Sequence, residues 1–265
     1  MTERRRHAFR ERLAFLPDIH IPHHDPKAVE TALNVLRAFK PDTIFQIGDL
    51  LDCYAISRFE KDPQRVTSLQ DEFDQGRALL KRLRDEHPSA RIVIKEGNHE
   101  ERLQRFLWSR APELSGLRCL SIAEQLGLSE FNIEYFTGKQ RLRVGESFTV
   151  THGSIVRQRA GYTAHGEMFH RGGSGISGHT HRLSQVFRST DGGVHRWIEA
   201  GCLCSLSPEY GADRALDWQQ GFVLGQHYVD RDRGIDHLAL DLLPLTDGIV
   251  QFEGRVYGPD FVYAP

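Results

Sequence analysis

The sequence contains little cysteine: four residues among 265, of which the two closest form Cys202-Leu-Cys204. That spacing is neither a disulfide framework nor a zinc-finger pattern, and it indicates a reducing compartment. No apolar stretch approaches the roughly 18 residues that a membrane span needs, and the basic start Arg4-Arg5-Arg6 leads into charged residues, unlike a signal peptide. The sequence therefore predicts a cytoplasmic protein without membrane contact.

The sequence also lacks a large excess of positive or negative charge. Thirty-four Lys and Arg face 36 Asp and Glu, a net charge of −2, so no global field draws the chain toward nucleic acid or anionic lipid. Only the segment 1–12, a basic N-terminal arm, is expected to contact nucleic acid, and weakly. The remainder, 13–265, has the size of a single domain. Histidine, by contrast, is abundant: 14 residues, of the type that most often binds metals in proteins.

Strands and helices alternate in the first hundred residues. Short apolar runs at 13–16, 43–47 and 91–95 are typical of buried strands. Amphipathic patterns predict helices between them, one from Asp25-Pro26 to Pro41 and one over 73–83. This order predicts parallel strands with right-handed crossovers. Polar residues that follow the strands should then meet at one edge of the sheet, where such folds bind ligands.

The second half has a different pattern. A mostly helical segment at 103–128 precedes hairpin signals at 141–151 and 183–199, a short helix at 162–169, and strands at 222–229 and 237–243. We predict that these strands form a second, mostly antiparallel sheet packed on the first. The expected fold class is α/β, a two-sheet αββα sandwich with mixed parallel and antiparallel strands.

Five polar motifs follow predicted strands in order along the chain. They are Asp18-Ile-His20, Gly48-Asp49, Gly97-Asn98-His99-Glu100, His152-Gly153 and Gly178-His179-Thr-His181. Together they resemble the motif set of the calcineurin-like metallophosphoesterase superfamily, in particular its compact bacterial and phage members. The resemblance implies a dinuclear metal site at the carboxyl ends of the strands. One ion would be bound by Asp18, His20 and His181, and the other by Asn98, His152 and His179, with Asp49 bridging the two.

Mixed imidazole and oxygen ligands suit two divalent transition-metal ions such as Mn²⁺, Fe²⁺/Fe³⁺, Co²⁺ or Zn²⁺ better than Ca²⁺ or Mg²⁺. Two ions about 3.5 to 4 Å apart acidify a shared water and neutralise phosphoryl oxygens. The resemblance thus implies a phosphoesterase in which hydroxide from the metal pair attacks phosphorus. His99, which is not a ligand in the family, would stabilise the transition state or protonate the leaving alkoxide. Glu100, which follows His99 and is not itself a ligand, would hold the His99 ring.

Four further residues are candidates for substrate contacts, with a solvated loop as the alternative explanation for each. His23 follows the first motif, Tyr54 follows the second, and Arg157 and Arg159 follow the His152 loop. A guanidinium at that place could bind a phosphate. Cys202 and Cys204 are interpreted as small packing residues.

The substrate class is open at this level. A phosphodiester or phosphomonoester, small and nucleotide-like, is favoured. A serine/threonine phosphoprotein phosphatase is an alternative, but Gly48-Asp49 is followed by Leu-Leu-Asp-Cys-Tyr54 and lacks the arginine of the Gly-Asp-x-Val-x-Arg-Gly motif. A DNA exonuclease is another, although only about 80 residues follow His181. The third alternative is a non-catalytic, metal-dependent binding scaffold. Proteins of that type tend to lose metal ligands, whereas this sequence retains all seven.

Overall fold

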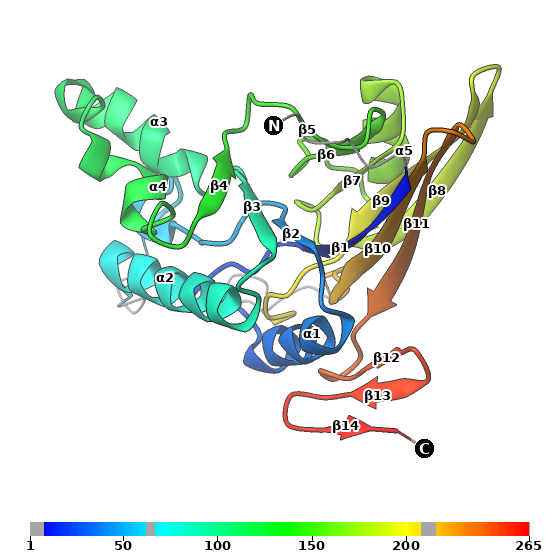
Figure 1. Ribbon diagram of the computed structural model, residues 1–265. Helices are drawn as coiled ribbons and strands as arrows, with labels where there is room; N and C mark the ends of the chain where they lie inside the picture. Colours follow the sequence, from blue (N-terminus) through cyan, green and yellow to red (C-terminus); the bar gives the residue numbers. More distant parts are fainter. Residues whose placement is uncertain (1–7, 62–66, 208–215, 265) are drawn as a thin grey trace, which may run out of the picture.

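The computed structural model describes residues 8–61, 67–207 and 216–264, and Figure 1 shows how its elements are arranged. Helices α1 and α2 lie on one side of a six-stranded sheet, and a five-stranded sheet packs against its other side. A further helix, α5, packs on the five-stranded sheet. The predicted α/β class and the mixed strand directions are confirmed.

The six-stranded sheet has the order β11-β10-β1-β2-β3-β4. Strands β1 to β4 run parallel, whereas β10 and β11 form an antiparallel hairpin that pairs with β1. The strands are β1 (Ala8–Leu16), β2 (Thr43–Gln46), β3 (Arg91–Lys95), β4 (Ile133–Phe136), β10 (Gly221–Asp230) and β11 (Ile235–Pro244).

Two expectations for this sheet were wrong. The hairpin at 221–244 was assigned to the second sheet, but it extends the first, with Ala8 opposite Asp230 and Phe15 opposite Val223. Residues 8–12 were assigned to a basic arm, but they form the first half of β1 and pair with β10. An alternating pattern identifies a strand but not the strand with which it pairs, so the position of the hairpin was missed. The first half of β1 was missed because its side chains at 10–12 are charged. The rest of the arm, 1–7, lies outside the described residues.

The five-stranded sheet has the order β5-β6-β7-β9-β8. It is mixed and not mostly antiparallel, because β7 runs parallel to both β6 and β9. Its strands are β5 (Leu142–Val144), β6 (Phe148–Val150), β7 (Gly175–Ser177), β8 (Leu183–Thr190) and β9 (Gly193–Ala200). A small third sheet, which the sequence did not predict, consists of β12 (Val250–Phe252), β13 (Arg255–Tyr257) and β14 (Val262–Tyr263).

The helices begin and end at recognisable capping residues. Asp25 accepts hydrogen bonds from the first N–H groups of α1 (Pro26–Phe39), and Ser68 and Asp71 form a capping box on α2 (Leu69–Glu86). The predicted helical region after residue 100 consists of α3 (Glu101–Arg110), η2 (Pro112–Leu114), η3 (Arg118–Leu120) and α4 (Ile122–Gln125). Two more helical elements are η1 (Tyr54–Ile56) and α5 (Tyr162–Arg171).

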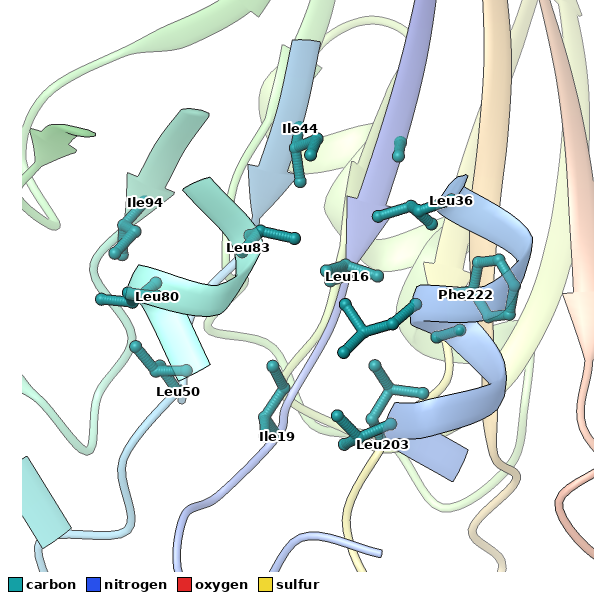
Figure 2. Close-up of a cluster of buried hydrophobic side chains, with 14 of the residues drawn as sticks. Leu16, Ile19, Leu36, Ile44, Leu50, Leu80, Leu83, Ile94, Leu203 and Phe222 are labelled. Carbon is teal, nitrogen blue, oxygen red and sulfur yellow. The ribbon is translucent and has the colours of Figure 1, made fainter. Parts of the chain in front are cut away.

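Separate apolar clusters join the layers. Figure 2 shows the largest, in which Leu36 of α1 and Leu80 and Leu83 of α2 pack on strand residues such as Ile44. Between the sheets, the rings of Phe15 and Phe45 are stacked with centroids 5.0 Å apart. These contacts fix where β1, β2 and β3 end, and therefore where the motif loops begin. No described helix combines the length and the apolar character that crossing a bilayer requires.

Candidate metal centre

The loops that carry the motifs turn through unusual backbone conformations. Asp18, His20, Asp49, His179 and His181 have φ angles of 36°, 55°, 52°, 72° and 56°. Of the ten described non-glycine residues with positive φ, these make up half. Such conformations cost on the order of 1 to 3 kcal/mol each and concentrate at functional sites. The strain therefore marks these loops independently of any motif.

The motif glycines leave space for the acidic side chains beside them. A Cβ atom on Gly97 would lie 2.3 Å from the backbone nitrogen of Asp49, and one on Gly178 would lie 2.0 Å from Asp18 Oδ2. Neither contact can form without displacing a buried carboxylate or its backbone. Glycine is thus required at both positions by close approach.

One group of side chains consists of Asp18, His20 and His181, all buried. His20 Nε2 lies 3.0 Å from His181 Nε2, which lies 3.4 Å from Asp18 Oδ1. Each ring turns its other nitrogen toward a neighbour: His20 Nδ1 is 3.3 Å from Asp52 Oδ1, and His181 Nδ1 is 3.7 Å from Cys204 Sγ. With Nδ1 protonated, the two Nε2 lone pairs point at one another, an arrangement that a bound cation or a proton would stabilise.

A second group surrounds His152. Its Nε2 lies 3.2 Å from Asp49 Oδ2, 3.0 Å from Asn98 Oδ1 and 3.2 Å from His179 Nδ1. His152 Nδ1 faces the carbonyl oxygen of Ile47 at 3.2 Å, so in the neutral ring Nδ1 carries the proton and Nε2 is an acceptor that faces other acceptors. Such a convergence of electron pairs fits a cation.

Asp49 connects the two groups. Its Oδ2 atom is 3.2 Å from His152 Nε2 and 3.6 Å from His20 Nε2, while Oδ1 accepts the His99 backbone N–H at 3.0 Å. Although burial raises it, contacts with His152 and His99 hold the pKa of Asp49 well below its usual range. One ionised oxygen atom therefore faces both groups. All seven residues that the motifs single out as ligands lie together at this edge of the sheets.

The histidines differ in their affinity for protons. Burial lowers the pKa of His20 to about 4. Against the effect of burial, Asp49 raises the pKa of His152 to about 9, and contacts with Cys204 and Asp18 raise that of His181 to about 10. Because a metal ligand must be deprotonated, protons and divalent cations compete for these nitrogens.

Two residues that the sequence analysis missed surround His99. Its Nδ1 atom lies 2.8 Å from the carbonyl oxygen and 3.1 Å from Oδ1 of Asp52, and Arg102 Nη2 lies 2.9 Å from its Nε2. Arg102 Nη1 also donates to Asp52 O at 2.6 Å. Arg102 is one helical turn after His99, a spacing that could have indicated it. No comparable spacing points to Asp52. Its position depends on the course of a loop in which the next residue, Cys53, has a left-handed backbone conformation, and the order of residues in the sequence does not predict that course.

Glu100 was expected to hold the His99 ring, and this expectation was wrong. Its carboxylate accepts backbone N–H groups from Asp49 at 3.1 Å, Leu51 at 2.8 Å and Gly97 at 2.9 Å. Asp52 holds the ring instead. Glu100 lies behind the Asp49 loop, where burial raises its pKa to about 7. The longer glutamate side chain reaches back into the loop from the start of α3.

The four candidates for substrate contact differ in position. His23 borders the site, with Nε2 3.8 Å from Asp52 Oδ2. Tyr54 turns into its own loop, where its hydroxyl donates to Glu60 O at 2.6 Å. Arg157 and Arg159 are exposed, and no described contact joins either guanidinium to the seven residues. Cys202 and Cys204 are buried as expected, but Cys204 also contacts His181.

Comparison with known proteins finds relatives in phages and a solved structure with a similar fold. No family model matches the chain. It is 26% identical over 262 residues to the Gene 54 protein of Mycobacterium phage L5, covering 93% of this chain and 98% of that protein. The Gene 54 protein of Mycobacterium phage D29 is 27% identical over 265 residues, with the same coverage.

Among solved structures, Vacuolar Protein Sorting 29 (Vps29) from Cryptosporidium parvum matches 97% of this chain and 100% of its own, with a TM-score of 0.50 at 13% identity. Vps29 from Chaetomium thermophilum matches 89% of this chain and 95% of its own, with a TM-score of 0.41 at 11% identity. The fold is similar to that of the first, a calcineurin-like metallophosphoesterase fold. At this edge of that fold, the chain has several His, Asp and Cys clusters that could bind metal ions.

Proposed function

We propose that the chain is a two-metal phosphoesterase that hydrolyses phosphodiester or phosphomonoester bonds. The observation that carries this proposal is the position of Asp49 Oδ2, 3.2 Å from a nitrogen of one histidine group and 3.6 Å from a nitrogen of the other. A carboxylate in this position would contribute to the binding of a cation at either group. Two divalent cations held there would acidify a water and neutralise the charge of the phosphate.

The donor set supports transition metals. Five imidazole or amide donors and two carboxylates fit manganese, iron, cobalt or zinc better than magnesium or calcium. We assign one ion to Asp18, His20, Asp49 and His181, and the other to Asp49, Asn98, His152 and His179. The two phage relatives match along nearly their whole length, so the motif-bearing chain has the same compact size in all three proteins.

His99 is assigned to the leaving group. Its side chain is 16% exposed, whereas that of Asp49 is 2% exposed, so His99 lies at the open side of the site. Burial alone would lower the pKa of His99, but Asp49 and Asp52 together raise it. A proton on Nε2 would pass to a departing alkoxide once the Arg102 guanidinium, which contacts that nitrogen at 2.9 Å, has turned onto the phosphate. Arg102 would then supply a positive charge for the phosphate oxygens.

A binding scaffold is the competing function, because the shared fold with Vps29 does not by itself distinguish a scaffold from an enzyme. The presence of His99 with all seven ligand candidates supports the enzyme. A scaffold would take up metal and show no turnover on any ester. The two functions therefore differ in one measurable quantity, the rate per bound metal pair.

The test is Asp49→Asn, measured after chelation and reloading with manganese. We expect the variant to lose the paired metal content and at least about 100-fold of the rate on bis-p-nitrophenyl phosphate and p-nitrophenyl phosphate, an effect of about 3 kcal/mol on the barrier. Asp85→Asn, at an exposed carboxylate of α2, is the matched control and should retain both. A parental rate in Asp49→Asn would refute the assignment. A metal-loaded parent protein without turnover would favour the scaffold.

A further inference from the structure

A groove of about 770 Å³ begins at Asn98 and is lined by α3 and by the segment 56–59. Arg102 lies where the groove meets the candidate metal centre, because its guanidinium contacts both Asp52 O and His99 Nε2. The groove is therefore continuous with the proposed catalytic site. A volume of this size exceeds what a single phosphate group would fill.

The groove is basic, although the whole chain carries a net charge of −2. Its described lining contains Arg58, Arg102, Arg105 and Arg110 against one acidic residue, Glu101. Glu101 pairs with Arg105 at 2.8 Å. No ion pair joins Arg58 or Arg110 to another residue of the described chain. Arg58 lies 5.8 Å from the centroid of the Phe59 ring. The charges of Arg58 and Arg110 are thus available to an anion from outside.

Large aromatic side chains are exposed beside these arginines. Phe59, Phe106 and Trp108 all line the groove and are 59%, 40% and 56% exposed. Exposed apolar groups gathered in one concave surface mark a binding site. Aromatic faces interleaved with arginines are the arrangement that binds single-stranded nucleic acid, because bases stack on the rings while the phosphates meet the cations. In a duplex the base faces are already stacked on one another.

We infer that this groove binds single-stranded nucleic acid and leads the strand to the metal centre. The occupant is then a polynucleotide, longer than the small nucleotide-like substrate that the sequence favours. Helix α3 has 10 residues and is about 15 Å long, which gives room for roughly four nucleotides at a stacked spacing of about 3.4 Å. Strand binding is independent of catalysis, whereas cleavage of the bound strand rests on the proposed phosphoesterase function.

The test measures binding without cleavage. The full chain is titrated, in EDTA, against a fluorescent oligodeoxythymidine of about 12 nucleotides, and the anisotropy is recorded. An abasic strand of the same length has the same phosphates and no bases, and we expect it to bind at least 10-fold more weakly. A Phe59→Ala, Trp108→Ala double variant should lose about 10- to 100-fold in affinity for the thymidine strand. Arg110→Gln should reduce the slope of log affinity against log salt by about 0.7.

Tyr263→Ala is the matched control, since Tyr263 is an aromatic residue on β14, 60% exposed and outside the lining of the groove. It should bind the strand like the parent protein. Equal affinity for the intact and abasic strands would overturn the inference, as would equal affinity of the double variant and the control. An acidic polyglutamate peptide that binds as tightly as the oligonucleotide would overturn it too.

Hydrolysis of bis-p-nitrophenyl phosphate under manganese, measured in parallel, separates this inference from the proposed function. Turnover of the small diester together with no strand binding would refute the groove assignment and leave the phosphoesterase standing. Strand binding in EDTA with no hydrolysis of any ester would support the groove and refute the phosphoesterase.

Discussion

Two buried glutamates hold the loop that carries Asp49. Glu100 accepts the backbone N–H groups of Asp49 and Leu51, and Glu72 of α2 accepts that of Cys53 at 2.6 Å. Both side chains are almost fully buried. Each carboxylate has therefore lost its hydration and forms hydrogen bonds to the backbone of the loop instead. The position of this loop determines where Asp49 and Asp52 lie.

Glu72 should make stability depend on pH. Burial raises the pKa of Glu72 from an ordinary value of 4.5 to about 7. Between these two values the folded state holds a proton on Glu72 that the unfolded state has released, so the contribution of Glu72 to the free energy of unfolding falls as pH rises from about 4.5 to 7 and is level above that. The full effect is about 3 kcal/mol. Glu72→Gln retains an acceptor for Cys53 and removes this loss.

Urea unfolding in EDTA at pH 5 and pH 8 checks this prediction. The variant should match the parent at pH 5 and exceed it by about 2 to 3 kcal/mol at pH 8. Glu146→Gln, at an exposed position of the β5–β6 turn, should follow the parent at both pH values. The same pH slope in Glu72→Gln and the parent would contradict the proposed origin of the effect.

The residues of the site divide into those that the sequence could reveal and those that it could not. The seven ligand candidates and His99 belong to short motifs at strand ends, where spacing and chemistry are visible together. Asp52 and Glu100 act through the course of a loop, which depends on Cys53 in a left-handed conformation and on hydrogen bonds from residues distant in the sequence. No local pattern encodes such contacts.

Among the elements, local patterns predicted α1 from its apolar periodicity and β2 and β3 from short apolar runs. Strand β4 escaped detection because Glu134 interrupts its apolar run and a helical region precedes it, and β12 to β14 have two or three residues each. The partner of the β10–β11 hairpin was also missed. Strand pairing across the chain is decided by tertiary packing, which a hairpin signal does not contain.

Helix α5 depends on one large side chain of the sheet below it. Trp197 of β9 is fully buried, packs against Ala164 and Met168, and donates from Nε1 to Ser177 Oγ at 3.0 Å. Trp197→Ala should lower the free energy of unfolding by about 3 to 5 kcal/mol, because it leaves a cavity between helix and sheet. Trp108→Ala removes an exposed tryptophan and should cost less than about 1 kcal/mol. Comparable losses in urea unfolding would show that α5 does not depend on this contact.

At the scale of the whole molecule, the candidate metal centre joins the two sheets. Asp18, Asp49 and Asn98 follow strands of the six-stranded sheet, and His152 and His179 follow strands of the five-stranded one. Bound cations would therefore link the layers across their shared edge, in addition to the apolar contacts between them.

Metal removal should accordingly destabilise the folded chain. Cations at about 1,000 times their dissociation constant contribute about 4 kcal/mol, which corresponds to a melting temperature higher by roughly 8 to 16 °C for a chain of this size. Differential scanning calorimetry with manganese and with EDTA measures the shift, and Asp49→Asn should show much less of it. An unchanged melting temperature after complete loss of the metal would contradict a link between the sheets.

The position of β1 has a consequence for synthesis on the ribosome. This strand leads directly to Asp18 and His20, yet one of its two neighbours, β10, begins only at Gly221. A nascent chain thus emerges from the exit tunnel with one side of β1 unpaired until β10 has also emerged. We expect the six-stranded sheet, and with it the pocket at its rim, to close only after the β10–β11 hairpin has left the tunnel.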